Sequence, residues 1–228
     1  MEADLLENDG EVKSGSSEAY DSLMAYISSH DLSDDDYYHH VASRMDIDEF
    51  IDYQASEMYF VNTDWPGNNM VYWRAREEGG RWRWILLDTD FGFGLKESGA
   101  GADFNMIAFA TQPDGPYWPN PPWSSFLLRN LIKNKTFISR FVERCNMHLS
   151  STFAPERVID ILDRIAEAIE PEIQRQYDRW SWIVASETGY GPFFTTIQEW
   201  RDAIDGMRQF ADARSAHMRK HLKEAFGN

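Results

Sequence analysis

The chain has 228 residues, of which 43% are apolar and 14% aromatic, so it can bury a substantial core. Its 38 acidic and 22 basic side chains give a formal net charge of −16, which argues against nucleic acid as a partner because phosphates would be repelled. A basic protein or bound metal ions suit this charge better, and simple solubility also explains it. With Cys145 as its single cysteine, the chain forms neither an internal disulfide nor a cysteine-based zinc site.

The N-terminal residues have neither the basic region nor the apolar stretch of a signal peptide. No run in the sequence approaches the ~18 apolar residues of a membrane span. Residues 1–18 are polar and acidic, with a serine-rich patch at 14–17, and this composition predicts a flexible acidic tail or linker. The sequence leaves the compartment open.

Helical patterns begin directly after this segment. Apolar residues at helical spacing predict a helix over 19–29. Asp46, followed three residues later by Glu49, has the pattern of a capping box and predicts a second helix that ends near Asn62. A proline and a glycine then stop the helix, so residues 62–69 are predicted to form a loop rich in carboxylate and amide groups.

A β-hairpin is predicted over residues 70–87, with its turn at Glu77–Gly80. Its second strand becomes fully apolar at Ile85-Leu86-Leu87, a pattern typical of a strand whose end enters the core. Such an end would hold the acidic residues that follow it, in Asp-Thr-Asp-Phe-Gly at 88–92, in a rigid position.

The rest of the chain divides into a loop and a helical tail. Residues 95–122 are rich in Gly, Pro and Asn, and a segment of this length without periodicity is usually functional or mobile. Residues 124–226 are predicted to be helical, with a break or kink at Pro171 and a second capping box at Thr196 and Glu199. The fold class predicted is α+β and mainly helical, with one small β-hairpin.

The segment 62–92 contains the groups that phosphoryl transfer requires. Asp64 and Asn69 have the spacing of the Asp and Asn in the protein-kinase catalytic loop, Asp-x-x-x-x-Asn. In this interpretation Asp64 accepts the proton of the substrate hydroxyl, and Asn69 binds Mg²⁺ through its amide oxygen. The hairpin returns the chain to the same place, where Asp90-Phe91-Gly92 matches the kinase Asp-Phe-Gly triplet. Each feature alone is common in turns, but their joint order is far more specific.

Several stretches resemble the CotH family of spore-coat proteins, whose pattern is Asn-x-Asp-Trp-x-x-Asn-Asn, then a Trp-containing strand and Asp-x-Asp. They are Asp48–Tyr53, Asn62–Asn69, Trp82–Gly94, Trp200-Arg201 and Phe210–Arg214. The resemblance implies an atypical, secretory-type protein kinase that uses ATP with Mg²⁺ or Mn²⁺. It also implies phosphorylation of serines on a spore-coat protein, for which a serine-rich, basic substrate is expected, and a spore-coat or cell-surface location.

Carried over residue by residue, the resemblance implies that Asp64 is the catalytic aspartate. It implies that Asn69, Asp88 and Asp90 bind the metal and the nucleotide. Asp88 and Asp90 both fit the Asp-x-Asp pattern, and the sequence does not separate them. The other asparagines of the loop either support the site or simply fix the loop through side-chain-to-backbone bonds.

The resemblance implies a kinase-like C-terminal lobe over residues 19–228. A kinase also needs a strand-rich N-terminal lobe, but the residues before Asp46 show no strand run and no Gly-rich motif. We therefore expect this lobe to be absent, either naturally or because the chain is a fragment, and phosphate transfer to be weak or undetectable. Two other functions fit the sequence: a non-catalytic coat or cell-surface module, and a metal-dependent nucleotide-sugar transferase that uses Asp88-Thr89-Asp90.

Overall fold

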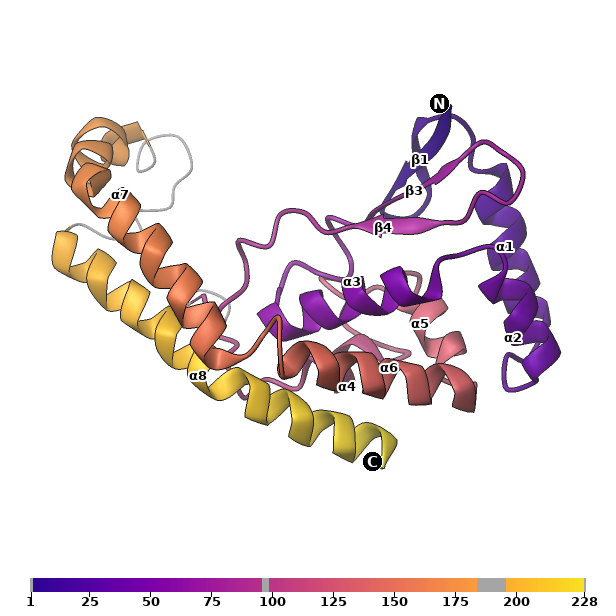
Figure 1. The fold of residues 1–228 in the computed structure, drawn as a ribbon. Coiled ribbons are helices and arrows are strands. Elements are labelled where there is room, and N and C mark those ends of the chain that lie inside the picture. Colours follow the sequence, from indigo (N-terminus) through magenta and orange to yellow (C-terminus); the bar gives the residue numbers. More distant parts are fainter. Residues whose placement is uncertain (1, 96–98, 184–195, 228) are drawn as a thin grey trace.

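The computed structural model describes residues 2–95, 99–183 and 196–227, which form a mainly helical α+β fold with a small antiparallel sheet at one end (Figure 1). This confirms the prediction of a mainly helical α+β fold, although the sheet has four strands where a single hairpin was predicted. The elements are β1 Ala3–Glu7, β2 Glu11–Ser14, α1 Glu18–Ser29, α2 Asp35–Ala42, α3 Ile47–Phe60, β3 Val71–Ala75, β4 Arg83–Ile85, α4 Met106–Ala110, α5 Phe126–Leu131, α6 Lys135–Leu149, α7 Pro155–Ile183 and α8 Ile197–Phe226. None of the described helices combines the length and the apolar character that a membrane crossing requires.

Ala3–Glu7 and Glu11–Ser14 form strands, where the sequence predicted a flexible tail over residues 1–18. β1 pairs antiparallel with both β2 and β3, and the sheet order is β2-β1-β3-β4. The carboxylate of Asp4 is buried and accepts hydrogen bonds from the Ser16 N–H and the Arg74 side chain, both at 2.9 Å. The sequence does not predict β1, because Leu6 is the only apolar residue that this strand buries fully. The cation that neutralises Asp4 is Arg74, which lies far along the chain.

The hairpin predicted over residues 70–87 is confirmed, since β3 and β4 pair antiparallel with Tyr72 opposite Trp84. The expectation that its second strand ends in the core is wrong. Ile85 and Leu86 are 38% and 44% exposed, and β4 ends at Ile85. The alternation of side chains along a strand explains this outcome, because Trp82 and Trp84 occupy the inward positions and Ile85 must point outward.

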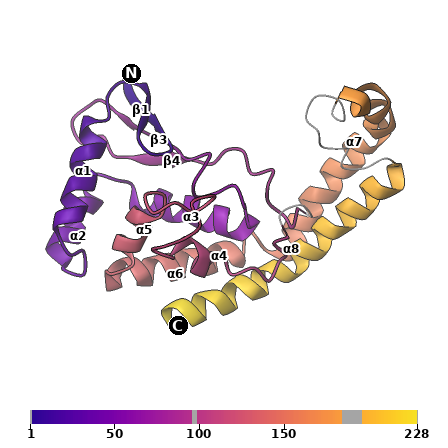
Figure 2. The same cartoon turned by 180° about the vertical axis from the view of Figure 1, so that it is seen from behind.

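Helix α3 lies at the centre of the molecule and packs against β4, α4, α6 and α8 (Figure 2). It ends at Phe60, close to the predicted end, but the predicted capping box does not form. The Asp46 carboxylate instead accepts hydrogen bonds from Arg81 and Arg83, and the Glu49 carboxylate accepts the N–H of Trp84 at 2.9 Å. These two acids therefore attach the start of α3 to the region of β4.

The segment 95–122 contains one short helix that the sequence did not predict. In α4, the Asn105 side chain caps the helix by accepting the N–H of Ala108 at 3.0 Å. Helices α5 to α8 lie where the helical tail was predicted, but residues 184–195 of that prediction fall outside the described part of the chain. The capping box at Thr196 forms as predicted. Helix α7 continues through Pro171, so the predicted break does not occur, but its ribbon changes direction along its length, as a kink would require (Figure 1).

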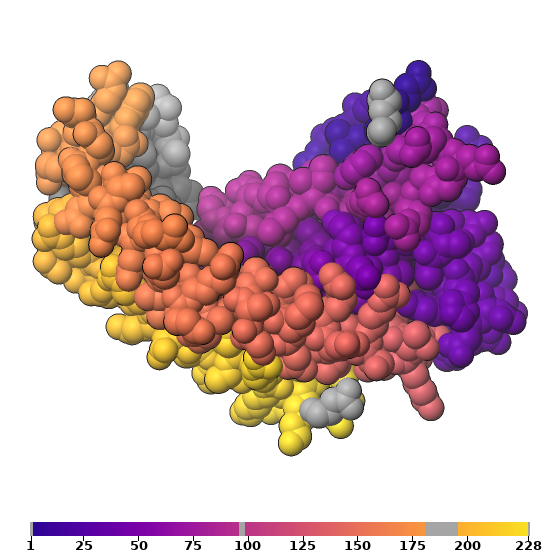
Figure 3. All heavy atoms as spheres, in the orientation of Figure 1, coloured from indigo at the N-terminus to yellow at the C-terminus, as the bar shows by residue number. Residues whose placement is uncertain are grey.

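Helices α7 and α8 pack along each other and form an arm that projects from the rest of the molecule (Figures 1 and 3). The ion pairs Arg201–Glu170 and Arg208–Asp163 join the two helices at the partly exposed surface. Towards its C-terminal end α8 leaves the arm and contacts α3, α4 and α6. The same helix therefore belongs to the arm at one end and to the core at the other.

Candidate functional site

The end of α3 is fixed by a buried arginine. The guanidinium of Arg214, on α8, is fully buried and donates hydrogen bonds to the backbone oxygens of Met58, Tyr59, Ala102 and Phe104 at 2.6 to 3.0 Å. Met58 and Tyr59 belong to the last turn of α3, where the regular pattern of helical hydrogen bonds ends and the Met58 oxygen receives only the Val61 N–H, at 3.4 Å, from the cap. Burial lowers the pKa of Arg214 to about 10. Arg214 thus holds the point from which the 62–69 loop departs.

The loop begins with a strained turn and a buried asparagine. Val61 has φ 54°, a left-handed conformation that is unusual for a β-branched residue. The Asn62 side chain donates hydrogen bonds to the Glu57 carboxylate at 2.9 Å and to the Asp88 backbone oxygen at 3.3 Å. Its oxygen accepts the N–H of Asp64 at 3.2 Å. Asn62 therefore links α3, the loop and the segment after β4.

Asp64 is held by the two asparagines that follow it in the same loop. One oxygen of its carboxylate accepts hydrogen bonds from the side chains of Asn68 at 2.7 Å and Asn69 at 3.0 Å. The side chain is partly buried, so it remains accessible to a ligand. Charge-assisted hydrogen bonds of this kind fix the orientation of a carboxylate.

Two contacts attach the loop to neighbouring segments. The Gly67 N–H donates to the Pro119 oxygen at 2.6 Å, and a Cβ atom at Gly67 would lie 2.5 Å from the same oxygen, so the approach requires glycine. The Thr63 N–H donates to the Phe91 oxygen at 3.2 Å. The 62–69 loop is therefore fixed between residues 88–92 and the end of the 95–122 segment.

Asp88 and Asp90 lie next to this loop. The pKa of Asp88 is raised from its ordinary value, first by a hydrogen bond with Asp90, and also by the charges of Asp90 and Asp64, while a hydrogen bond with Asn69 lowers it. Both Asn69 and Asp88 have left-handed backbones, with φ 56° and 50°, a conformation that Asn and Asp tolerate better than most residues. The structure thus brings together all four residues that the sequence singled out.

The donor atoms of this cluster fit a divalent cation. Asp88 and Asp90 offer carboxylate oxygens and Asn69 an amide oxygen, which is the ligand type that Mg²⁺ prefers. Among the described residues, no lysine or arginine forms an ion pair with Asp64, Asp88 or Asp90. A cation between Asp88 and Asp90 would relieve the repulsion that raises the Asp88 pKa.

The described part of the chain holds no group of three His, Cys, Asp or Glu side chains arranged for a metal ion. The candidate set therefore consists of two carboxylates and one amide. Such a small protein contribution is compatible with Mg²⁺, which usually retains several waters and takes further oxygens from substrate phosphates.

Glu57 is a residue of this region that the sequence analysis missed. Its side chain is fully buried behind Asn62, and burial raises its pKa to about 7 although the hydrogen bond from Asn62 lowers it. One of its oxygens accepts the Asn62 hydrogen bond, and the other has no partner among the described residues. No sequence signal marks Glu57, since an acid on a helix is common and its burial depends on the elements that pack around α3.

Comparison with known proteins agrees with this arrangement. A family model described as CotH kinase protein matches residues 2–218, a range that includes the β1–β2 hairpin as well as the 62–92 segment. No curated protein matches the chain. Because the family model covers most of its length, the chain belongs to the CotH kinase protein family.

Proposed function

We propose that this chain carries the phosphotransfer site of an atypical protein kinase, which transfers the γ-phosphate of ATP to a Ser or Thr hydroxyl of a protein. The observation that carries the proposal is the convergence of Asp64, Asn69, Asp88 and Asp90 in a member of the CotH kinase protein family. Kinases of this kind use ATP, so membership supports a nucleotide in this site. In this proposal residues 19–228 correspond to a kinase C-terminal lobe.

Each residue has a separate task in this reaction. The Asp64 carboxylate, oriented by Asn68 and Asn69, accepts the proton of the acceptor hydroxyl. At the same time the hydroxyl oxygen bonds to the γ-phosphorus of ATP, and the bond from that phosphorus to the bridging oxygen breaks, so that ADP leaves. Asn69, Asp88 and Asp90 would hold Mg²⁺ or Mn²⁺, and the bound cation supplies neutralisation of the phosphate oxygens. Asn62 fixes Asp64 relative to Asp88 through its two contacts.

The geometry favours Asp88 over Asp90 as the main metal ligand. Asn69 and Asp64 both lie near enough to Asp88 to influence the pKa of its carboxyl, and Asp90 is its strongest acidic neighbour. The Asn62 contact to the Asp88 backbone oxygen also fixes Asp88 more tightly to the loop. We therefore assign Asp88 the principal role and Asp90 a supporting one.

We further propose that the isolated chain binds ATP weakly and transfers phosphate slowly. Phosphotransfer sites normally use a lysine to hold the ATP phosphates, and the described residues pair no lysine with the acidic cluster. The net charge of −16 also opposes a free polyphosphate until cations bind. The same charge favours a basic, serine-rich acceptor protein.

A radiolabel transfer assay tests the proposed function. The chain is incubated with Mn²⁺, γ-labelled ATP and a synthetic peptide of alternating serine and lysine, beside Asp64→Asn and the control Asp114→Asn on the 95–122 segment. We expect slow labelling of serine that Asp64→Asn abolishes and the control retains. Equal labelling by the wild type and Asp64→Asn would contradict the assignment, and transfer from a labelled UDP-sugar in place of ATP would favour the sugar-transferase alternative.

A further inference from the structure

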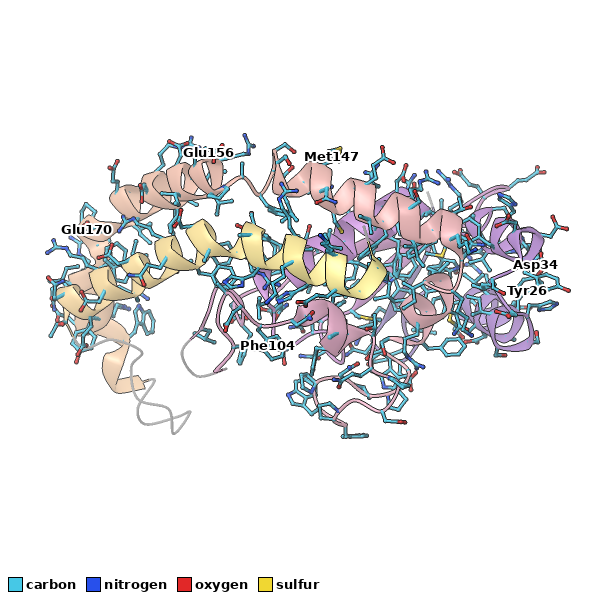
Figure 4. All side chains as sticks on the ribbon, turned by 90° about the horizontal axis from the view of Figure 1, so that it is seen from below. Tyr26, Asp34, Phe104, Met147, Glu156 and Glu170 are labelled. Atoms are coloured by element: carbon cyan, nitrogen blue, oxygen red, sulfur yellow. The ribbon has the colours of Figure 1, made fainter. Side chains whose placement is uncertain are left out.

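A pocket of about 350 Å³ opens beside Asp64. Thr63 and Asp64 form its polar side. The remaining wall is apolar and consists mainly of Phe91, Phe104, Met106, Phe109 and Trp118. Figure 4 shows Phe104 on the segment that leads into α4. A mainly apolar pocket with a few polar groups at one side is the usual form of a specific ligand site.

The walls of this pocket are held in place by hydrogen bonds. The Thr63 hydroxyl and N–H both donate to the Phe91 oxygen at 3.2 Å. The Gly67 N–H donates to the Pro119 oxygen at 2.6 Å, next to Trp118. The buried side chain of Asn120 donates to the Phe109 oxygen at 2.6 Å. All three segments of the wall are thus fixed relative to one another, so the pocket is formed before any ligand binds.

Two aromatic side chains of the wall remain open to solvent. Trp118 is 55% exposed and Phe91 is 44% exposed. Exposed aromatic surface that adjoins a formed pocket is typical of a binding site for another polypeptide, in which aromatic residues supply much of the affinity.

We propose that this pocket binds the acceptor polypeptide, by taking an aromatic or large aliphatic side chain next to the phosphorylated Ser or Thr. The inference rests on the proposed function, because it places the acceptor hydroxyl at Asp64. Asp64 also lines the pocket, and one residue of extended chain spans only ~3.5 Å, so the neighbouring side chain reaches the apolar wall.

The acidic residues near the pocket indicate which charged residues the acceptor should contain. Asp64, Asp88 and Asp90 lie beside the pocket, and no described lysine or arginine forms an ion pair with them. The acceptor that fits therefore combines an apolar residue beside the hydroxyl with lysine or arginine further along. A nucleotide base fits the pocket less well, because among the described residues only Thr63 and Asp64 line it with polar side chains, and a base edge needs matched hydrogen bonds.

Fluorescence anisotropy with two labelled peptides tests this inference. The first peptide is Lys-Gly-Phe-Ser-Phe-Gly-Lys, and in the second both phenylalanines are alanine. We expect the wild-type chain to bind the first peptide about tenfold more tightly, as burial of an aromatic side chain implies. We expect Trp118→Ala to reduce this preference to less than about threefold. Trp180→Ala, which removes a tryptophan of α7 that is 40% exposed, should leave this preference unchanged.

Two results would overturn the inference. One is equal binding of both peptides by the wild type, and the other is an unchanged preference in Trp118→Ala. A parallel titration with Mn²⁺ and ATP separates this inference from the proposed function. Normal ATP binding without a peptide preference would overturn the acceptor pocket and leave the kinase proposal intact. Loss of ATP binding in Trp118→Ala would make the pocket a nucleotide site and would also overturn the inference.

Discussion

The two ends of α8 are held by opposite means. In the arm, Arg201 and Arg208 form ion pairs with α7 that are open to solvent, with side chains that are 37% to 50% exposed. In the core, Arg214 is fully buried and bonds only to backbone oxygens. Exposed ion pairs contribute little to stability, whereas a buried charge that loses its partners costs much. The contacts of α8 beside the candidate site therefore contribute more to stability than its contacts in the arm.

The largest effect is expected for Arg214→Ala. The substitution removes the Arg214 hydrogen bonds from four backbone oxygens, two of them at the end of α3, and leaves a cavity where the buried guanidinium was. We expect the free energy of unfolding to fall by about 3–5 kcal/mol. Urea denaturation measures it, and a loss below about 1 kcal/mol would show that this contact does not anchor the loop.

The second effect concerns the buried acid Glu57. Its pKa is about 7 in the folded protein and 4.5 in a free side chain, so the folded state keeps a proton that the unfolded chain releases between these values. The contribution of Glu57 to stability is therefore greatest below about pH 4.5 and declines as pH rises to about 7. Glu49, with a pKa also raised to about 7, contributes in the same direction.

Glu57→Gln isolates this contribution, because Glu49 remains in both proteins. We expect the decline in unfolding free energy between pH 5 and pH 7 to be smaller in the variant, by about 2–3 kcal/mol. Thermal or urea unfolding at several pH values measures the difference. Parallel curves for the two proteins would show that Glu57 ionises normally in the folded state.

A third effect is expected at Asn62, the side chain that links α3, Asp64 and Asp88. Asn62→Ala leaves the buried Glu57 carboxyl without its donor and frees the loop. We expect a loss of about 1–3 kcal/mol in the free energy of unfolding. Metal affinity should fall as well, because the Asp88 backbone loses its support. A stability loss with unchanged Mn²⁺ affinity would restrict Asn62 to a structural role.

The smallest effect is expected for Arg208→Ala in the arm. Its ion pair with Asp163 lies at the surface and is screened by solvent, so we expect the free energy of unfolding to change by less than about 1 kcal/mol. Urea denaturation beside Arg214→Ala provides the direct comparison, since both arginines lie on α8. Similar losses in the two variants would remove the distinction between arm and core.

The features that the sequence could predict are those that depend on residues close together in the chain. The hairpin at 70–87 and the loop with Asp64 and Asn69 follow from a turn and from residue spacing, which are local properties. The strand with Asp4 and the burial of Glu57 depend on residues far along the chain, so no local pattern reveals them. Aspartate at the start of α3 also looked like a cap, but distant arginines compete for it.

The central claim is that Asp88 and Asp90 form, with Asn69, the cation site of a phosphotransfer centre. Calorimetric titration of Mn²⁺ and then ATP tests it, with the wild-type chain beside an Asp88→Asn/Asp90→Asn double variant of equal stability. We expect the wild type to bind Mn²⁺, the variant to lose this binding, and ATP to bind only when Mn²⁺ is present. Equal Mn²⁺ binding by two equally folded proteins, or none by either, would contradict the proposed cation site. It would favour a non-catalytic coat or cell-surface module.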